Sequence, residues 1–268
     1  MMSSRPKFMA AFALLAVLGV GVNSARSESV TTSTVGVGTG LNFTIHTDGT
    51  VALIGGGSSV STNGHQFSTT FHSANSFLPT GSSIRSFCVD LARGLSSGTH
   101  IVADVSWFGG TSVDANGNSR NIGSAGWVVR NYGDATLAAL QSLIGDAALT
   151  QAEANTALQI SVWSAAYTTL TTIDTVGAKL WFTSGDAGFS RVVTLANTIL
   201  GLKGSQTDSA GFVNYPPPGT GTNSQEMLFS VPEPSSLVIA GLCALGMVSY
   251  GVRRGRQKVS QRNLLPAA

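Results

Sequence analysis

The sequence predicts an α+β fold with a strand-rich N-terminal half and a helical middle. An uncharged stretch near each end of the chain encloses about 200 residues, which is enough for one domain. Up to about residue 110 of this segment, apolar and polar residues alternate between turns that contain Gly, Asn or Asp, as in β-strands. After residue 122 the apolar residues recur at helical spacing. We therefore expect strands first, helices next, and then a further strand and helix.

The N-terminus has the three parts of a secretory signal peptide. Arg5 and Lys7 supply a positive start, residues 8–22 carry no charge, and small residues follow up to Ser27. The apolar run is shorter than the roughly 20 residues that a membrane-spanning helix needs. We expect residues 1–27 to be a signal peptide that is cleaved near its end. A buried core helix or an uncleaved anchor is the alternative.

Strands are expected in three places in the N-terminal half. Residues 41–53 alternate around Asp48 and Gly49, a pair that accepts positive φ and is a strong hairpin signal. Residues 86–91 and 101–108 have the composition of two further strands. The sequence therefore predicts a hairpin followed by two more strands.

Residues 114–118 imitate the start of a calcium-binding loop. The segment begins with Asp114, but Ser119 and Ala125 occupy the positions of the glycine and of the final acid in such a loop. We expect a simple turn here. The four histidines are scattered, without the His-x-x-x-His spacing of a zinc site. We expect no metal, no cofactor and no catalytic residues, so the chain is not predicted to be an enzyme.

The second half alternates helices with short strands. The clearest helix covers residues 151–167, because Thr150 and Glu153 have the spacing of a capping box. The other expected elements are helices over 123–132, 135–144 and 189–202 and strands over 178–182 and 227–231. Because a Pro/Gly-rich stretch begins at Pro216, we divide the chain into a domain over 28–213 and a linker with the last strand over 214–230.

The C-terminus combines a proline-flanked acid, an apolar stretch and a basic cluster. The first part is Val231, Pro232, Glu233 and Pro234, and the basic residues at the other end include Arg253, Arg254 and Arg256. Residues 235–252 between them carry no charge and are a candidate membrane-spanning helix. The arginines would hold their end in the cytoplasm, together with the tail over 259–268. The two prolines favour an extended backbone around the acid.

This order of features resembles the PEP-CTERM sorting signal of Gram-negative bacteria, over residues 231–258. The resemblance implies that an exosortase recognises the segment in the membrane and removes it, and that the protein is released or attached at the cell surface. It also implies association with an extracellular or biofilm matrix. An ordinary C-terminal membrane anchor is the alternative.

Removal of the two ends changes the charge of the chain. The whole sequence has a formal charge of +2, but residues 28–231 hold 7 basic and 12 acidic residues, hence a net charge of −5. No basic patch is left for nucleic acid, so we exclude that class of partner. Cys243 lies in the C-terminal apolar stretch, so Cys88 is the single cysteine of the predicted mature segment. Since exported domains usually pair their cysteines, this indicates an intermolecular bond or a reactive thiol.

On the helix predicted over 151–167, a glutamine shares a face with apolar residues. Gln159 lies on the same side as Val162, Trp163 and Ala166, because residues three and four apart are neighbours on a helix. A buried amide without hydrogen-bond partners costs roughly 1–3 kcal/mol. We therefore expect Gln159 to have a specific partner in the fold.

Phe87 and Cys88 on a strand, with residues 158–163 on a helix, resemble the two halves of the thioester domains of Gram-positive surface adhesins. The resemblance spans residues 85–167. It implies that the Cys88 thiol attacks the side-chain carbonyl of Gln159, that ammonia leaves, and that an internal thioester remains. A lysine amine or a sugar hydroxyl of a target would then open it in a single, non-repeating reaction. Asp90 and Trp163 are candidates for orienting this site.

Other interpretations stay open from the sequence. Cys88 also fits a small buried hydrophobic residue, with Gln159 bonded to a nearby backbone group. Asp90 also fits an exposed strand residue. A non-covalent structural or glycan-binding component of the exopolysaccharide matrix is the alternative function.

Overall fold

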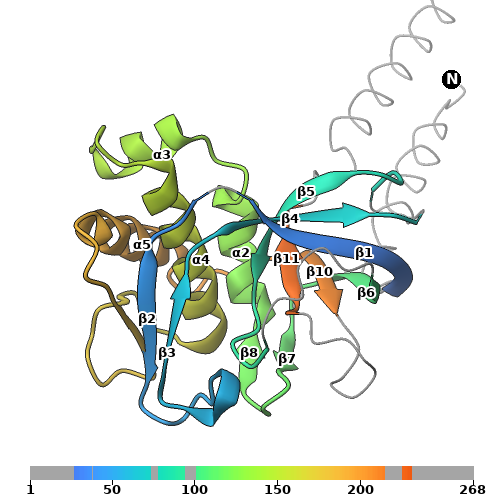
Figure 1. The fold of residues 1–268 in the computed structure, drawn as a ribbon, viewed down its shortest axis with the longest axis horizontal. Helices are drawn as coiled ribbons and strands as arrows, with labels where there is room; N and C mark the ends of the chain where they lie inside the picture. The colour runs from blue at the N-terminus through green and yellow to red at the C-terminus, as the bar shows by residue number, and fades with distance from the viewer. Residues whose placement is uncertain (1–26, 38, 74–77, 94–100, 215–224, 231–268) are drawn as a thin grey trace, which may run out of the picture.

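The computed structural model describes residues 27–37, 39–73, 78–93, 101–214 and 225–230. These residues form a β-barrel on one side and a group of helices on the other, with a small sheet lying against the helices (Figure 1). The α+β class is thus confirmed as a mixture of strands and helices. Among the described residues no helix is long and apolar enough to cross a membrane. The predicted helix over 235–252 lies outside them, as do nearly all of the predicted signal peptide and the tail.

The barrel closes with six antiparallel strands. Their order around the barrel is β1 (Ser27–Val37), β4 (Gln66–Phe71), β5 (Ser83–Cys88), β11 (Met227–Phe229), β10 (Ala210–Asn214) and β6 (Ile101–Phe108). Closure pairs every strand on both sides, so the barrel has no free edge. The three-residue strand β11, from the far end of the described chain, fills the gap between β5 and β10.

Hydroxyl side chains line part of the barrel interior. Thr34 Oγ1 is 2.8 Å from Thr69 Oγ1, which is 2.8 Å from Ser86 Oγ, and all three residues are buried. Each hydroxyl can donate one hydrogen bond and accept others, so this row is satisfied internally. Because threonine and serine are polar residues, strands that bury them do not show the alternation of apolar and polar residues that predicts a strand. For that reason β1 and β4, which carry much of this row, were not predicted.

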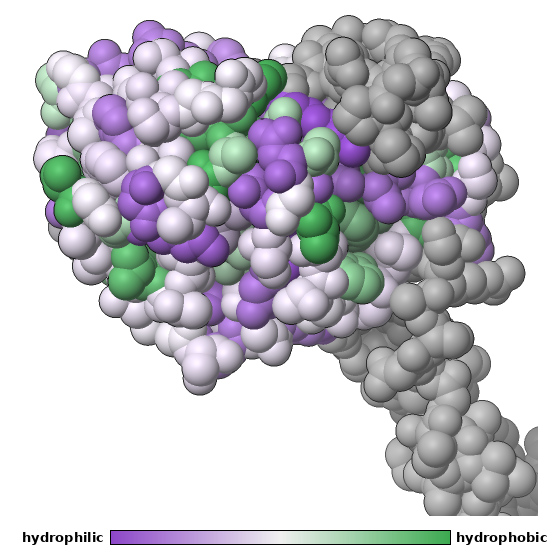
Figure 2. Space-filling model, turned by 90° about the horizontal axis from the view of Figure 1, so that it is seen from below, coloured by the Kyte–Doolittle hydropathy of each residue, from purple (hydrophilic) through white to green (hydrophobic). Residues whose placement is uncertain are grey.

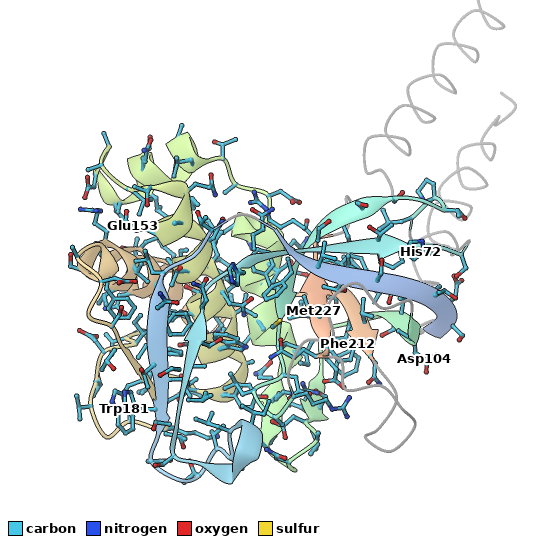
Figure 3. The ribbon with its side chains drawn as sticks, viewed as in Figure 1. His72, Asp104, Glu153, Trp181, Phe212 and Met227 are labelled. Carbon is cyan, nitrogen blue, oxygen red and sulfur yellow. The ribbon has the colours of Figure 1, made fainter. Side chains whose placement is uncertain are left out.

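The helices pack around α4 (Gln151–Tyr167), whose bounds agree with the prediction. The others are α2 (Ile122–Tyr132), α3 (Leu137–Ile144) and α5 (Phe189–Lys203), each within two residues of its predicted bounds. The capping box is present, because Glu153 N donates to Thr150 Oγ1 and Thr150 N donates to Glu153 Oε2. Glu153, labelled in Figure 3, also pairs with Arg191 of α5. Of the 17 residues of α4, 15 are buried, so the helix is enclosed on all sides rather than along one apolar face.

The small sheet corrects one prediction. It has the order β3 (Ser59–Asn63), β2 (Asn42–Thr47) and β9 (Leu180–Thr183). Asp48 and Gly49 do form a turn after β2, and Gly49 has the expected positive φ of 91°. The chain then passes through a 3-10 turn at Ile54–Gly56 before it returns as β3, so the tight hairpin over 41–53 was wrong. Residues 114–118, which were expected to be a turn, form the turn between β7 (Thr111–Val113) and β8 (Ser119–Asn121).

The surface seen from below in Figure 2 is dominated by hydrophilic and intermediate residues. Apolar residues on this face lie in separate small groups among polar ones. The described residues visible on this face therefore form no broad apolar area.

Candidate functional site

Cys88 is the last residue of β5, at the place where the barrel meets the helices. The pairing of β4 with β5 stops at Phe67 and Ser86, so it does not reach Cys88. On the other side β11 pairs with β5, and Val89 N donates to Glu226 O at 2.9 Å. Because successive residues of a strand direct their N–H groups to opposite sides, the backbone of Cys88 faces away from β11. Its N–H and C=O therefore need a partner from outside the sheet.

Gln159 of α4 supplies that partner. Its Oε1 accepts a hydrogen bond from Cys88 N at 3.1 Å, and its Nε2 donates to Cys88 O at 2.8 Å. The carboxamide thus takes the place of a neighbouring strand residue. Both residues are fully buried. The structure brings together the two residues that the sequence singled out, although 71 positions separate them.

The thiol itself is directed toward a residue that was not predicted. Cys88 Sγ donates to Gln225 Oε1 at 2.6 Å and lies 3.5 Å from Met227 Sδ. Gln225 Nε2 in turn donates to Asp90 O at 2.9 Å. Met227, labelled in Figure 3, lies on β11 where the barrel meets the helices. No feature of the sequence distinguishes Gln225, which is one polar residue after a Pro/Gly-rich stretch.

Cys88 is a free thiol whose surroundings oppose ionisation. Burial raises its pKa well above the ordinary value of 9.0, and the negative charge of Asp90 raises the pKa further. The thiol is therefore protonated at neutral pH. The sulfur has little thiolate character until a reaction removes its proton.

Asp90 follows the end of β5 and is fully buried, so its interpretation as an exposed strand residue was wrong. Its Oδ1 accepts from Ala92 N at 2.7 Å, and its Oδ2 lies 3.4 Å from Arg93 Nε. Burial raises the pKa of Asp90, against the opposing effects of the Ala92 N–H and of Arg120. The carboxylate adds negative charge beside the thiol. A role in orienting the site stays a prediction.

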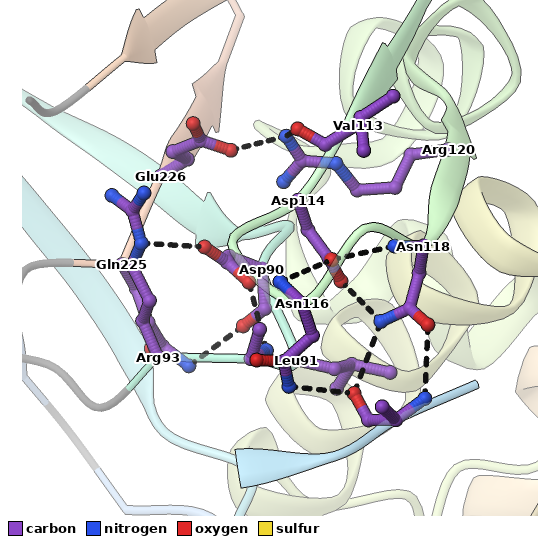
Figure 4. Close-up of polar contacts among 12 residues, drawn as sticks. Asp90, Leu91, Arg93, Val113, Asp114, Asn116, Asn118, Arg120, Gln225 and Glu226 are labelled. Carbon is purple, nitrogen blue, oxygen red and sulfur yellow. Dashed lines mark hydrogen bonds and ion pairs between the residues drawn. The ribbon is translucent and has the colours of Figure 1, made fainter. Parts of the chain in front are cut away.

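A buried ion pair adjoins the site and was also missed. Arg120 of β8 pairs with Glu226, the residue before β11, and Arg120 Nη2 is 3.3 Å from Val113 O (Figure 4). The exposed fractions are 1% for Arg120 and 5% for Glu226. Burial raises the pKa of Glu226 more than the charge of Arg120 lowers it. The pair holds the start of β11 against the β7–β8 hairpin.

The loop that begins at Asp114 lies beside these buried charged residues (Figure 4). Asp114 Oδ1 accepts from the N–H groups of Asn116 and Asn118, both at 2.9 Å, as Figure 4 shows. Its Oδ2 accepts from Tyr167 Oη at 2.8 Å and from Asn118 Nδ2 at 2.7 Å. Tyr167 ends α4, so the loop is tied to the helix that carries Gln159. Among the described residues no group of three His, Cys, Asp or Glu side chains could hold a metal ion.

Trp163 lies one turn after Gln159 on α4 and borders a cavity of about 650 Å³. It packs against Phe43 with ring centroids 6.1 Å apart and is 4% exposed. Its Nε1 has no hydrogen-bond partner among the described residues. The other walls of the cavity include Ile45, Phe67, Leu91, Arg93 and Gln225. Cys88 and Gln159 do not line it, whereas Gln225, which accepts a hydrogen bond from the thiol, does.

Comparisons with known proteins address the domain and the C-terminus separately. No curated protein matches the chain. A similar solved structure is an N-terminal thioester domain of a surface protein from Clostridium perfringens, with 12% identity and a TM-score of 0.38. The match covers 71% of this chain and 98% of that one. At this TM-score the likeness carries no weight for the chemistry, which we derive from the contacts around Cys88.

The C-terminal comparison bears on residues outside the described part of the structure. These are the predicted sorting residues Val231, Pro232, Glu233 and Pro234 and the basic residues Arg253, Arg254 and Arg256. A PEP-CTERM sorting motif implies an exported protein that an exosortase processes and that reaches the cell surface. Residues 230–256 match the PEP-CTERM protein-sorting motif, which confirms the predicted resemblance.

Proposed function

We propose that this exported surface protein attaches covalently to a target through an internal thioester between Cys88 Sγ and Gln159 Cδ. The observation that carries the proposal is the pair of hydrogen bonds that holds the Gln159 carboxamide on the backbone of Cys88. A buried glutamine could bond to many other groups, whereas this one is fixed on the backbone of the residue that carries the single described thiol. The same two hydrogen bonds would also satisfy the carboxamide of an unreactive buried glutamine, so a chemical test distinguishes the two cases.

The Cys88 N–H is placed to assist the reaction. It donates to Gln159 Oε1, the oxygen on which negative charge develops when sulfur attacks the amide carbon. In serine proteases the backbone N–H of the nucleophile likewise forms part of the oxyanion hole. One such donor typically contributes 10²–10³ in rate, which is about 3–4 kcal/mol.

The proposed reaction has two balanced steps. In the first, a bond forms between Sγ and Cδ, the bond between Cδ and Nε2 breaks, and the thiol proton leaves with the nitrogen as ammonia. In the second, an amine or hydroxyl of the target bonds to Cδ, the bond between Cδ and Sγ breaks, and the proton of the nucleophile passes to sulfur, so that the Cys88 thiol is regenerated. The target ends as an amide or an ester of the Gln159 side chain. Since Gln159 is consumed, the protein is not a turnover enzyme.

The intact mass of the exported protein tests this function. A thioester removes one ammonia from the expected mass, and neither Cys88→Ala nor Gln159→Ala can show this deficit. Gln206→Ala is the matched control, because Gln206 bonds to Trp127 on an exposed part of the domain. Treatment with methylamine should replace the deficit by the mass of the amine adduct on Gln159. The full unmodified mass, with a thiol that is alkylated after unfolding, would reject the thioester.

A second candidate function rests on a different cavity. A hollow of about 960 Å³ lies between the C-terminal ends of α4 and α5 and the β7–β8 hairpin, and its walls are rich in threonine. Rows of hydroxyls suit non-covalent contact with a polysaccharide, which matches the alternative of a matrix component. Retention of Cys88→Ala by extracted matrix polysaccharide, with loss in Thr169→Arg but not in Ser58→Arg, would favour this function.

A further inference from the structure

The Cys88 sulfur is covered by the side chain of Gln225. Gln225 is half-buried and is fixed at both ends of its carboxamide, since Oε1 accepts from Sγ at 2.6 Å and Nε2 donates to Asp90 O at 2.9 Å. Its outer side lines the 650 Å³ cavity. The sulfur and the cavity are thus separated by one side chain.

The two glutamines around Cys88 have different geometry. The carbonyl oxygen of Gln159 accepts from a backbone N–H, which polarises that carbonyl for attack. The carbonyl oxygen of Gln225 faces the thiol instead, and among the described residues the thiol is its only donor. Without a second donor, a negative charge on that oxygen would be unsupported. Gln225 is therefore suited to hold the thiol and not to become acylated.

The cavity beside Gln225 has both apolar and polar walls. Its apolar walls include Ile45, Phe67 and the buried indole of Trp163, and its polar walls include Thr62 and Asn63. The Nε1 of Trp163 has no partner among the residues that the structure describes, although a buried donor without a partner is costly.

We infer that Gln225 is a positioning residue that orients the Cys88 thiol and closes the cavity against it. Rotation of this side chain opens the cavity onto the sulfur, and a small nucleophile bound against Trp163 then meets the reactive centre. The access of a nucleophile through the opened cavity rests on the proposed thioester, whereas the shielding of the thiol by Gln225 does not. The two parts are therefore measured separately.

The first experiment measures the free thiol in a background that cannot form the thioester. In full-length Gln159→Ala protein, the rate of Cys88 alkylation by iodoacetamide should rise about tenfold when Gln225→Ala is added, as expected for loss of one hydrogen bond and its cover. Gln206→Ala should leave the rate unchanged. If Gln159→Ala does not fold, Gln159→Glu provides the background, because it keeps an acceptor for Cys88 N. An unchanged rate in Gln225→Ala overturns the inference whether or not a thioester exists.

A charge variant separates positioning from a merely structural role. Gln225→Glu places a carboxylate beside the sulfur, which should raise the thiol pKa and shift the alkylation profile to higher pH than in Gln225→Ala. The same profile for both variants would show that the side chain at position 225 does not lie against the sulfur, and that result would overturn the inference. In protein with Gln159 intact, Gln225→Ala should speed consumption of the thioester by methylamine. Peptide mapping that finds the acyl bond on Gln225 would also overturn it.

Discussion

At the scale of single residues, the site is defined by a thiol that its surroundings keep protonated. Cys88 and Gln159 could be predicted because each is unusual for its place in the sequence, one as a lone cysteine and one as an amide on an apolar face. Gln225 and Glu226 could not be predicted, because their partners lie far away in the chain. Gln225 is 137 positions from Cys88, and Glu226 is 106 positions from Arg120. A high thiol pKa also makes the sulfur a poor leaving group, which would slow hydrolysis of a thioester.

Protein with a free Cys88 thiol should lose stability at alkaline pH. Because burial raises the thiol pKa in the folded state, the folded protein binds more protons than the unfolded chain above about pH 9.0, so the free energy of unfolding falls as pH rises through this range. Below pH 9.0 this contribution is fully present. Melting temperatures of the free-thiol protein and of Cys88→Ala, compared from pH 7 to 11, measure the difference. Tyr167, whose pKa is also raised by burial, is common to both proteins and cancels. Parallel curves would show that the thiol is solvated.

Glu226→Ala should cost about 3–5 kcal/mol of unfolding free energy, because it leaves the charge of Arg120 buried without its partner. Urea unfolding measures the loss. The partly exposed pair of Arg130 and Asp208 is the control, and Asp208→Asn should cost about 1 kcal/mol or less. The double change Arg120→Met with Glu226→Leu should recover much of the loss. An equal loss in the single and double variants would locate the effect in packing instead of charge.

At the scale of elements, local signals predicted the helices well and the barrel strands poorly. The bounds of α4 follow from a capping box, which depends on residues three apart. The partner of β2 depends instead on tertiary pairing with β3 and β9, so the Asp48-Gly49 turn was right and its hairpin wrong. The strands β1 and β4 bury threonines that bond to one another, and a pattern of apolar alternation does not detect them.

Thr150→Ala should destabilise the domain by about 1 kcal/mol, through loss of the hydroxyl that accepts from Glu153 N. The effect should be measurable as a lower urea midpoint with an unchanged slope. Thr150→Ser keeps the acceptor and should retain most of the stability. Because Glu153 also pairs with Arg191, the carboxylate should stay in place in both variants. Equal stability of the alanine and serine variants would show that the cap contributes nothing.

At the scale of the whole molecule, the chain end that precedes the sorting motif is built into the barrel. The strand β11 ends at Phe229, and the PEP-CTERM motif begins at residue 230. Removal of the motif therefore leaves the barrel complete, whereas a cut a few residues earlier removes both a strand and two site residues. The function of the domain and the processing of its tail are adjacent in sequence but separable in structure.

Truncation tests this separation. A chain that ends after Ser230 should unfold cooperatively and keep Cys88 inaccessible to alkylation. A chain that ends after residue 224 loses β11, Gln225 and Glu226, which leaves the edges of β5 and β10 open and Arg120 without its partner. It should unfold at a lower temperature and expose the thiol. Thermal unfolding with alkylation at each temperature measures both effects, and equal behaviour of the two chains would contradict the assigned role of β11.

The late position of β11 in the chain also sets an order of events during export. If the predicted signal leads the chain across the membrane, residues 225–229 emerge after every other described segment. Until they arrive, the barrel lacks one strand, and the sulfur of Cys88 has neither Gln225 nor Met227 beside it. The thiol is therefore uncovered until the last described strand has crossed, and the protection of the sulfur is completed only at the end of export.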